Sequence, residues 1–117
     1  MTLFSYGFAS GQTKSPLVRI ARLQIDPAQL DAYRAALKEH AETAVRVEPG
    51  VLSLYAVAEK DNPANITVFE IYADQAAYQA HLQTSHFKKY KSTTKDMVKS
   101  LQLVETDPIV LAAKSKL

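Results

Sequence analysis

The chain has 117 residues, with no cysteine, no tryptophan and only three glycines. The lack of cysteine excludes disulfide bonds, cysteine-based zinc fingers and thiol catalysis. Gly7, Gly11 and Gly50 are too few and too scattered to form a phosphate-binding loop. No apolar run approaches the roughly 20 residues of a membrane-spanning helix. The formal charge of +2 is too small to indicate a nucleic-acid partner. We therefore expect neither a membrane nor a nucleic acid as partner.

What is present is typical of one folded globular domain, because 47% of the residues are hydrophobic and 22% are charged. We expect a flexible N-terminal arm over residues 1–16 and a single domain over residues 17–117. The arm lacks the charged start of a whole signal peptide, but it is compatible with the remnant of a trimmed export signal. We expect a cytoplasmic protein, or a periplasmic one if the arm is such a remnant.

The first half of the chain predicts a strand followed by a long helix. Residues 17–25 alternate between two faces, which is typical of a strand. Asp26 and Pro27 are suited to cap and open a helix over residues 27–47, with Gln29 completing a capping box. The helix carries one apolar stripe at helical spacing, made of Leu30, Tyr33, Leu37, His40, Ala44 and Val47.

The second half predicts a hairpin, two short helices and a last strand. The hairpin strands are residues 51–59 and 65–73, joined by turn-forming residues. Asp74 caps a helix over residues 75–82, and Thr84 caps another that begins at residue 85, with an apolar stripe that runs as far as Leu101. The last strand is expected over residues 101–106.

Four lysines share one stripe if the second of these short helices is long, namely Lys88, Lys91, Lys95 and Lys99. This stripe is either a solvated helix face or a basic lip that attracts an anionic substrate.

The resulting order β-α-β-β-α-α-β predicts an α+β fold of the ferredoxin-like split βαβ type. The sheet is expected to be antiparallel, with the helices on one face. Its strands carry apolar residues on both faces, so the second face needs a cover. We expect a homodimer packed sheet against sheet, with the tail after Pro108 reaching the partner.

The segments EPGVLSLYAV and ITVFEIYADQAAYQAHLQTSHFKKY resemble the antibiotic biosynthesis monooxygenase family, and within it the small quinol monooxygenases. The resemblance covers about residues 17–111. It implies a dimeric α/β barrel with a pocket between sheet and helices. It also implies oxidation of phenols or quinols by molecular oxygen without metal, flavin or haem. The missing tryptophan argues against the haem-degrading branch. We therefore expect no cofactor.

The three histidines are the candidate catalytic residues. His86 lies in the first turn after the Thr84 cap, where the helix dipole disfavours the imidazolium form, so it suits a general base. His81 ends the preceding helix, where the dipole favours the protonated form. His40 lies on the buried stripe of the long helix. The alternatives are a local cap for His86, an ordinary helix end for His81 and a core residue for His40.

A second group is expected to bind the substrate: Tyr55, Phe69, Glu70, Tyr72 and Phe87. Its aromatic rings suit a flat ligand, or are plain core. Glu70 either contacts the ligand or pairs with Arg19, Arg22 or Arg46. A metal is not expected, because a helix break separates His81 from His86 and the nearest acids complete no ligand set.

With these candidate residues, the resemblance implies a cofactor-independent monooxygenase that oxidises a small aromatic quinol or phenol. An isomerase or tautomerase would use the same histidines without oxygen. A dimeric module that binds a small ligand without turnover is the alternative outside enzymes.

Overall fold

The computed structural model describes residues 15–115 of the chain. Nearly all of the expected N-terminal arm therefore lies outside the described residues. Within them, no helix is both long and apolar enough to cross a membrane.

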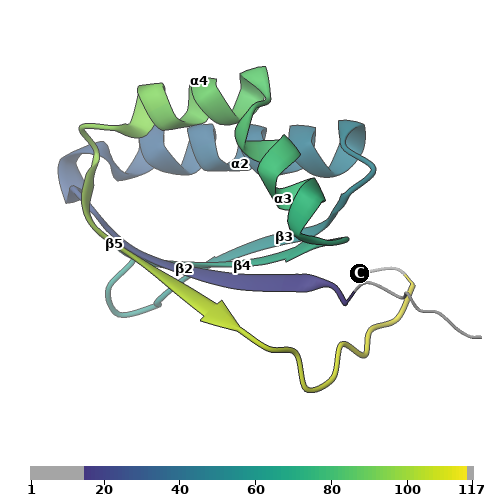
Figure 1. Ribbon diagram of the computed structural model, residues 1–117. Helices are drawn as coiled ribbons and strands as arrows, with labels where there is room; N and C mark the ends of the chain where they lie inside the picture. The colour runs from purple at the N-terminus through teal and green to yellow at the C-terminus, as the bar shows by residue number, and fades with distance from the viewer. Residues whose placement is uncertain (1–14, 116–117) are drawn as a thin grey trace, which may run out of the picture.

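The fold is the predicted ferredoxin-like α+β arrangement. The elements are, in order, β2 (Leu17–Ile25), η2 (Pro27–Gln29), α2 (Leu30–Val47), β3 (Val51–Ala58), β4 (Asn65–Tyr72), α3 (Gln75–Leu82), α4 (Ser85–Thr94) and β5 (Val98–Thr106). The strands form one sheet in the order β3-β4-β2-β5, and every neighbouring pair is antiparallel. The described α-helices, α2, α3 and α4, lie on the same side of this sheet (Figure 1).

The main core lies between α2 and the helix-side face of the sheet. Tyr33 and Leu37 of α2 pack against Ala21, Leu23 and other buried residues of β2 and β4. The predicted stripe of α2 is therefore confirmed over most of its length. It is wrong at its last position, because Val47 is 49% exposed at the end of the helix.

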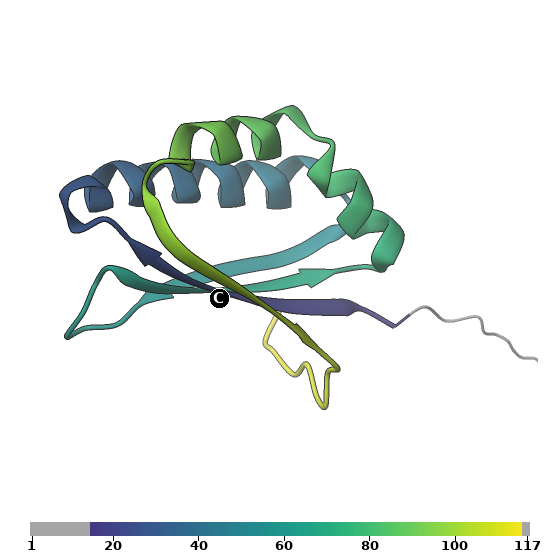
Figure 2. The same cartoon turned by 60° about the vertical axis from the view of Figure 1, so that its left-hand side comes forward.

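None of the described helices lies on the other face of the sheet (Figure 2). Strand register places Tyr55, Phe69, Ile20 and Val104 side by side across all four strands on this face. Side chains alternate along a strand, so the neighbours of this row in sequence point to the helices instead. We call this surface the open face. It has the apolar character that led us to expect a partner.

The boundary between α4 and β5 differs from the prediction. The helix ends at Thr94, and β5 begins at residue 98 rather than 101. The Met97 N–H bonds to the Thr94 carbonyl, and Val98 pairs with Ile25 of β2. Threonine is a weak helix former, so pairing with β2 takes over from helical spacing here. The predicted lysine stripe is therefore broken, because Lys99 lies on the strand.

Candidate active site

A cavity lies between the helices and the sheet. Its volume is about 110 Å³. Its wall is mainly apolar, with residues from all four strands and from α2, α3 and α4. Lys91 of α4 and Leu101 and Leu103 of β5 line it and are exposed, so its mouth lies between α4 and β5. Polar groups form the smaller part of this wall and converge on it from both the helices and the sheet.

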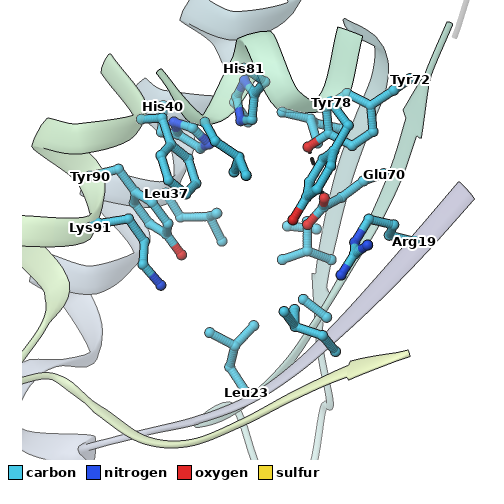
Figure 3. Close-up of a pocket in the computed structure, with 18 of the residues that line it drawn as sticks. Arg19, Leu23, Leu37, His40, Glu70, Tyr72, Tyr78, His81, Tyr90 and Lys91 are labelled. Carbon is cyan, nitrogen blue, oxygen red and sulfur yellow. Dashed lines mark hydrogen bonds between the residues drawn. The ribbon is translucent and has the colours of Figure 1, made fainter. Parts of the chain in front are cut away.

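The helix side of the cavity carries His81 and His40, and the sheet side carries Glu70 and Arg19 (Figure 3). Tyr72 and Phe87 also line it. The cavity thus brings together five of the predicted site residues, namely His40, His81, Glu70, Tyr72 and Phe87.

His81 is held in one orientation by Glu48. Its Nδ1 lies 2.7 Å from Glu48 Oε2, and the side chain of His81 is only 2% exposed. A carboxylate only accepts hydrogen bonds, so Nδ1 carries the proton and donates. In a neutral imidazole the lone pair then lies on Nε2. This nitrogen has no hydrogen-bond partner among residues 15–115.

His86 bonds to the same carboxylate oxygen from the other side. Its Nε2 lies 2.5 Å from Glu48 Oε2. Its ring lines a separate surface depression with Lys89 and Thr43, and not the cavity. The structure therefore places the predicted base behind Glu48, and puts His81 at the cavity wall.

Local caps explain why these groups meet. Glu48 follows the last residue of α2, where its N–H bonds to the Ala44 carbonyl. The hydroxyl of Thr84 accepts from the Phe87 N–H at 3.2 Å, and it donates to the His81 carbonyl at 2.8 Å. The predicted Thr84 cap is therefore confirmed. It also ties the end of α3 to the start of α4, which fixes the two histidines relative to each other.

His40 is a buried neutral residue beside this pair. Its ring is stacked on Tyr90 at 4.6 Å and lies 5.1 Å from the ring of His81. Burial, with the neighbouring histidines, lowers the pKa of His40 to about 4. Its Nδ1 is buried without a hydrogen-bond partner in the described part of the chain. His40 thus joins the core and the cavity wall at once.

Glu70 is a buried carboxyl group on the sheet side. The Tyr72 hydroxyl donates to its Oε1 at 2.8 Å. Burial raises the pKa of Glu70 above its usual value, against the opposing effects of Tyr72, His81 and Arg19. Arg19 lies opposite Glu70 in the register of β2 and β4, and its guanidinium stands 4.5 Å above the ring of Tyr78. Of the three arginines considered as partners, Arg19 is the one that lines this cavity.

Tyr55 and Phe69 do not reach the cavity. They pair with each other in the register of β3 and β4, on the open face of the sheet. Both are aromatic residues of strands that line the cavity, which is why they were predicted to bind the substrate. The alternation of the strands sends their rings to the opposite side.

Sequence reasoning missed Glu48 as a site residue. It lies 33 residues before His81 and 38 before His86, so no local spacing connects the three. Contrary to the expectation from the neighbouring acids, an acid distant in sequence completes a possible ligand set with His81 and His86. The ligand atoms of Glu48, His81 and His86 all lie within 4.8 Å of one another.

Comparisons with known proteins agree with this fold. Residues 16–93 match the family model described as antibiotic biosynthesis monooxygenase. A solved structure from Bacteroides thetaiotaomicron, named as a member of that class, is 52% identical, with a TM-score of 0.82 over 86% of this chain and 96% of the other. Among curated proteins, no match was found.

More distant structures share the same domain. One named as a monooxygenase from Lactobacillus acidophilus is 30% identical, with a TM-score of 0.74 over 78% of this chain and 45% of the other. One from Nitrosomonas europaea is 21% identical, with a TM-score of 0.76 over 80% of this chain and 90% of the other, and shows the fold alone. By its sequence match and its fold, the chain belongs to the antibiotic biosynthesis monooxygenase family.

Proposed function

We propose that this chain is a cofactor-independent monooxygenase for a small aromatic quinol or phenol, with His81 as the general base. The observation that carries the proposal is the orientation of His81. Glu48 holds its Nδ1–H, which leaves the lone pair on Nε2 of a ring that lines the cavity. Neutral imidazole in hydrogen-bond reach of a hydroxyl group is suited to remove its proton.

The reaction then uses the electrons of the substrate. His81 Nε2 takes the phenolic proton, and the aryloxide passes one electron to molecular oxygen. The resulting superoxide combines with the aryloxyl radical at a ring carbon and forms a peroxide. One oxygen atom stays as the new carbonyl of the quinone. The other leaves as water, together with the hydrogen of that carbon and the proton returned by His81.

The cavity supports this chemistry in two ways. Its apolar wall, with Phe87 among the lining residues, suits a flat ring system. The Glu48 carboxylate stabilises the imidazolium that forms on His81, because the two groups stay hydrogen-bonded at 2.7 Å. Orientation and exclusion of water are then the contributions of the protein.

The test is oxygen uptake by chelator-treated protein with a panel of naphthoquinols and anthrols, after subtraction of autoxidation. We expect His81→Ala to lower the rate by about 100-fold or more, the usual contribution of a general base. His86→Ala is the matched control, because it removes the other histidine on Glu48 and leaves the cavity wall intact. Loss of oxygen uptake in His86→Ala, with uptake retained in His81→Ala, would show that His86 is the base and His81 is not. No uptake above autoxidation with any substrate would reject the oxygenase for this panel.

An isomerase or tautomerase is the second candidate function, and Glu70 is the observation that favours it. A base on the helix wall faces a carboxyl group on the sheet wall whose pKa is raised by burial. Such a pair suits proton transfer between two positions of a carbonyl compound. Exchange of substrate hydrogen for solvent deuterium without oxygen uptake would support this alternative. Saturable binding with neither activity would instead indicate a ligand-binding module.

A further inference from the structure

We propose that Glu48, His81 and His86 bind a divalent transition-metal ion of the zinc class, and that the bound ion switches His81 off as a base. The second half of this proposal rests on the proposed function. The three donors come from the end of α2, the end of α3 and the first turn of α4. Two imidazole nitrogens and one carboxylate oxygen form a ligand set that suits zinc, cobalt or iron(II).

The donors are close, oriented and shielded. Their side chains are 13%, 2% and 16% exposed, in the order Glu48, His81, His86. Each histidine presents to Glu48 the nitrogen that would coordinate the ion, namely Nδ1 of His81 and Nε2 of His86. Tetrahedral ligands at about 2.1 Å from zinc stand about 3.4 Å apart. The present N···O distances of 2.7 and 2.5 Å therefore require the carboxylate to withdraw by about 1 Å when an ion replaces the two protons.

His40 supplies a separate observation at the same place. Its Nδ1 is buried and has no hydrogen-bond partner among the described residues. Its ring centre lies 5.1 Å from that of His81 and 6.0 Å from that of His86. A zinc ion held by three protein ligands keeps a water molecule in its fourth position, and hydrogen-bonding groups usually surround such a site. A water molecule carried by the ion would give His40 Nδ1 a partner.

The position of the ion decides its effect. It would bind the Nδ1 side of His81, which faces Glu48, while the substrate meets the ring from the cavity. A neutral imidazole that gives its Nδ1 lone pair to a metal keeps its single proton on Nε2. That nitrogen then donates and cannot take a proton from the substrate. Both histidines change tautomer without gaining or losing a proton overall, and the divalent ion with the single negative charge of Glu48 leaves a net charge of +1 at the site.

Cobalt(II) titration of the chelator-treated chain tests the site, with visible absorption as the readout and zinc(II) as competitor. We expect one cobalt ion per chain, with the absorption of a four- or five-coordinate complex, displaced by zinc. Glu48→Gln and His86→Ala should each weaken binding by at least tenfold. Glu42→Gln is the control, because it removes an exposed carboxylate of the same helix that pairs with Lys38. No saturable binding, or equal binding by Glu48→Gln and the unchanged chain, would overturn the site.

The switch is tested separately, with and without substrate. Long-range ¹H–¹⁵N NMR spectra of the histidines should show the proton of His81 on Nδ1 without zinc and on Nε2 with it. With substrate, oxygen uptake should fall at least tenfold on zinc loading and return after chelation. An unchanged tautomer, or unchanged or faster uptake, would overturn the switch. If no substrate is oxidised, the proposed function fails, and the cobalt titration and NMR spectra still decide this proposal.

Discussion

Glu48 accepts hydrogen bonds from two histidines that come from two different helices. We place it as a positioning residue, because it acts on the substrate only through His81. Glu48→Gln replaces the charged carboxylate with a neutral amide. The Nδ1–H of His81 therefore loses its charged acceptor. We expect kcat to fall by about tenfold or more with little change in KM, since the cavity wall is untouched.

The NMR tautomer of His81 separates this role from a merely structural one. In Glu48→Gln we expect a mixture of both tautomers, with Glu48→Asp restoring part of the Nδ1–H form. A fixed tautomer in Glu48→Gln, together with a normal kcat, would show that Glu48 does not orient His81.

Glu70 should make stability depend on pH in a direction opposite to that of a salt-bridged acid. Its folded pKa lies above the unfolded one, so the unfolded chain releases this proton more readily as pH rises. The contribution of neutral Glu70 is therefore complete below the unfolded pKa and is lost as pH rises through the folded pKa. Tyr72, His81 and Arg19 act on the pKa of Glu70 in the opposite direction to burial, and Tyr33 and Tyr90 also interact with its charge.

Glu70→Gln removes this ionisation. We expect the variant to melt at a higher temperature than the unchanged chain near pH 8, and the gap to shrink towards pH 4, where both side chains are neutral. Thermal unfolding across this range measures it. A variant that is less stable at pH 8 would show instead that ionised Glu70 is held favourably by Arg19.

The site residues show which features of a site can be predicted from a sequence and which cannot. The pattern of helix caps correctly placed His86 in a first helical turn and His81 in a last one. It could not tell which ring faces a cavity, because that depends on how α3 and α4 meet. Glu48 stayed hidden for the same reason, since contacts across 33 and 38 residues leave no periodic signal.

At the scale of elements, caps were the most predictable features. Asp26, Asp74 and Thr84 each accept a hydrogen bond from a backbone N–H of the helix that follows. A cap depends on a few neighbouring residues, so it can be read locally. The start of β5 could not be read locally. Helical spacing continues to Leu101 in the sequence, but pairing with β2 decides where the strand begins.

The turn between α2 and β3 packs closely against α3, and Gly50 makes this possible. A Cβ added at Gly50 would lie 2.5 Å from the Cβ of Ala77. We expect Gly50→Ala to lower the free energy of unfolding by about 1–3 kcal/mol, the usual cost of overpacking. Urea denaturation measures it.

A double-mutant cycle shows whether this contact is the cause. Ala77→Gly costs about 1 kcal/mol of helix propensity by itself, but it removes the clash. The double variant should therefore be more stable than the sum of the two changes predicts. Ala76→Gly is the matched control, because Ala76 is an exposed residue of α3. Additive behaviour with Ala77→Gly would place the cost elsewhere.

At the scale of the whole molecule, the fold was predictable because the strand alternation and the helix stripe point to one layered arrangement. The open face follows from the same strand alternation. Its row of Tyr55, Phe69, Ile20 and Val104 crosses the full sheet, and Tyr55 is 47% exposed in the single chain. Ile109 and Val110, in the tail that follows β5, are 99% and 73% exposed. Such surface is unusual for a monomer.

We therefore expect a homodimer in solution, with the open faces in contact and the tail against the partner. Val57 tests it, because it is 66% exposed and shares the open face with Thr67 and Arg22 in the strand register. Val57→Asp should leave the single chain folded and convert the dimer to the 12.9 kDa monomer in light scattering at micromolar concentration, since a carboxylate buried at the interface is unpaired. Val47→Asp is the control, with 49% exposure at the end of α2. A monomeric unchanged chain, or a dimer that tolerates Val57→Asp as well as Val47→Asp, would contradict this arrangement.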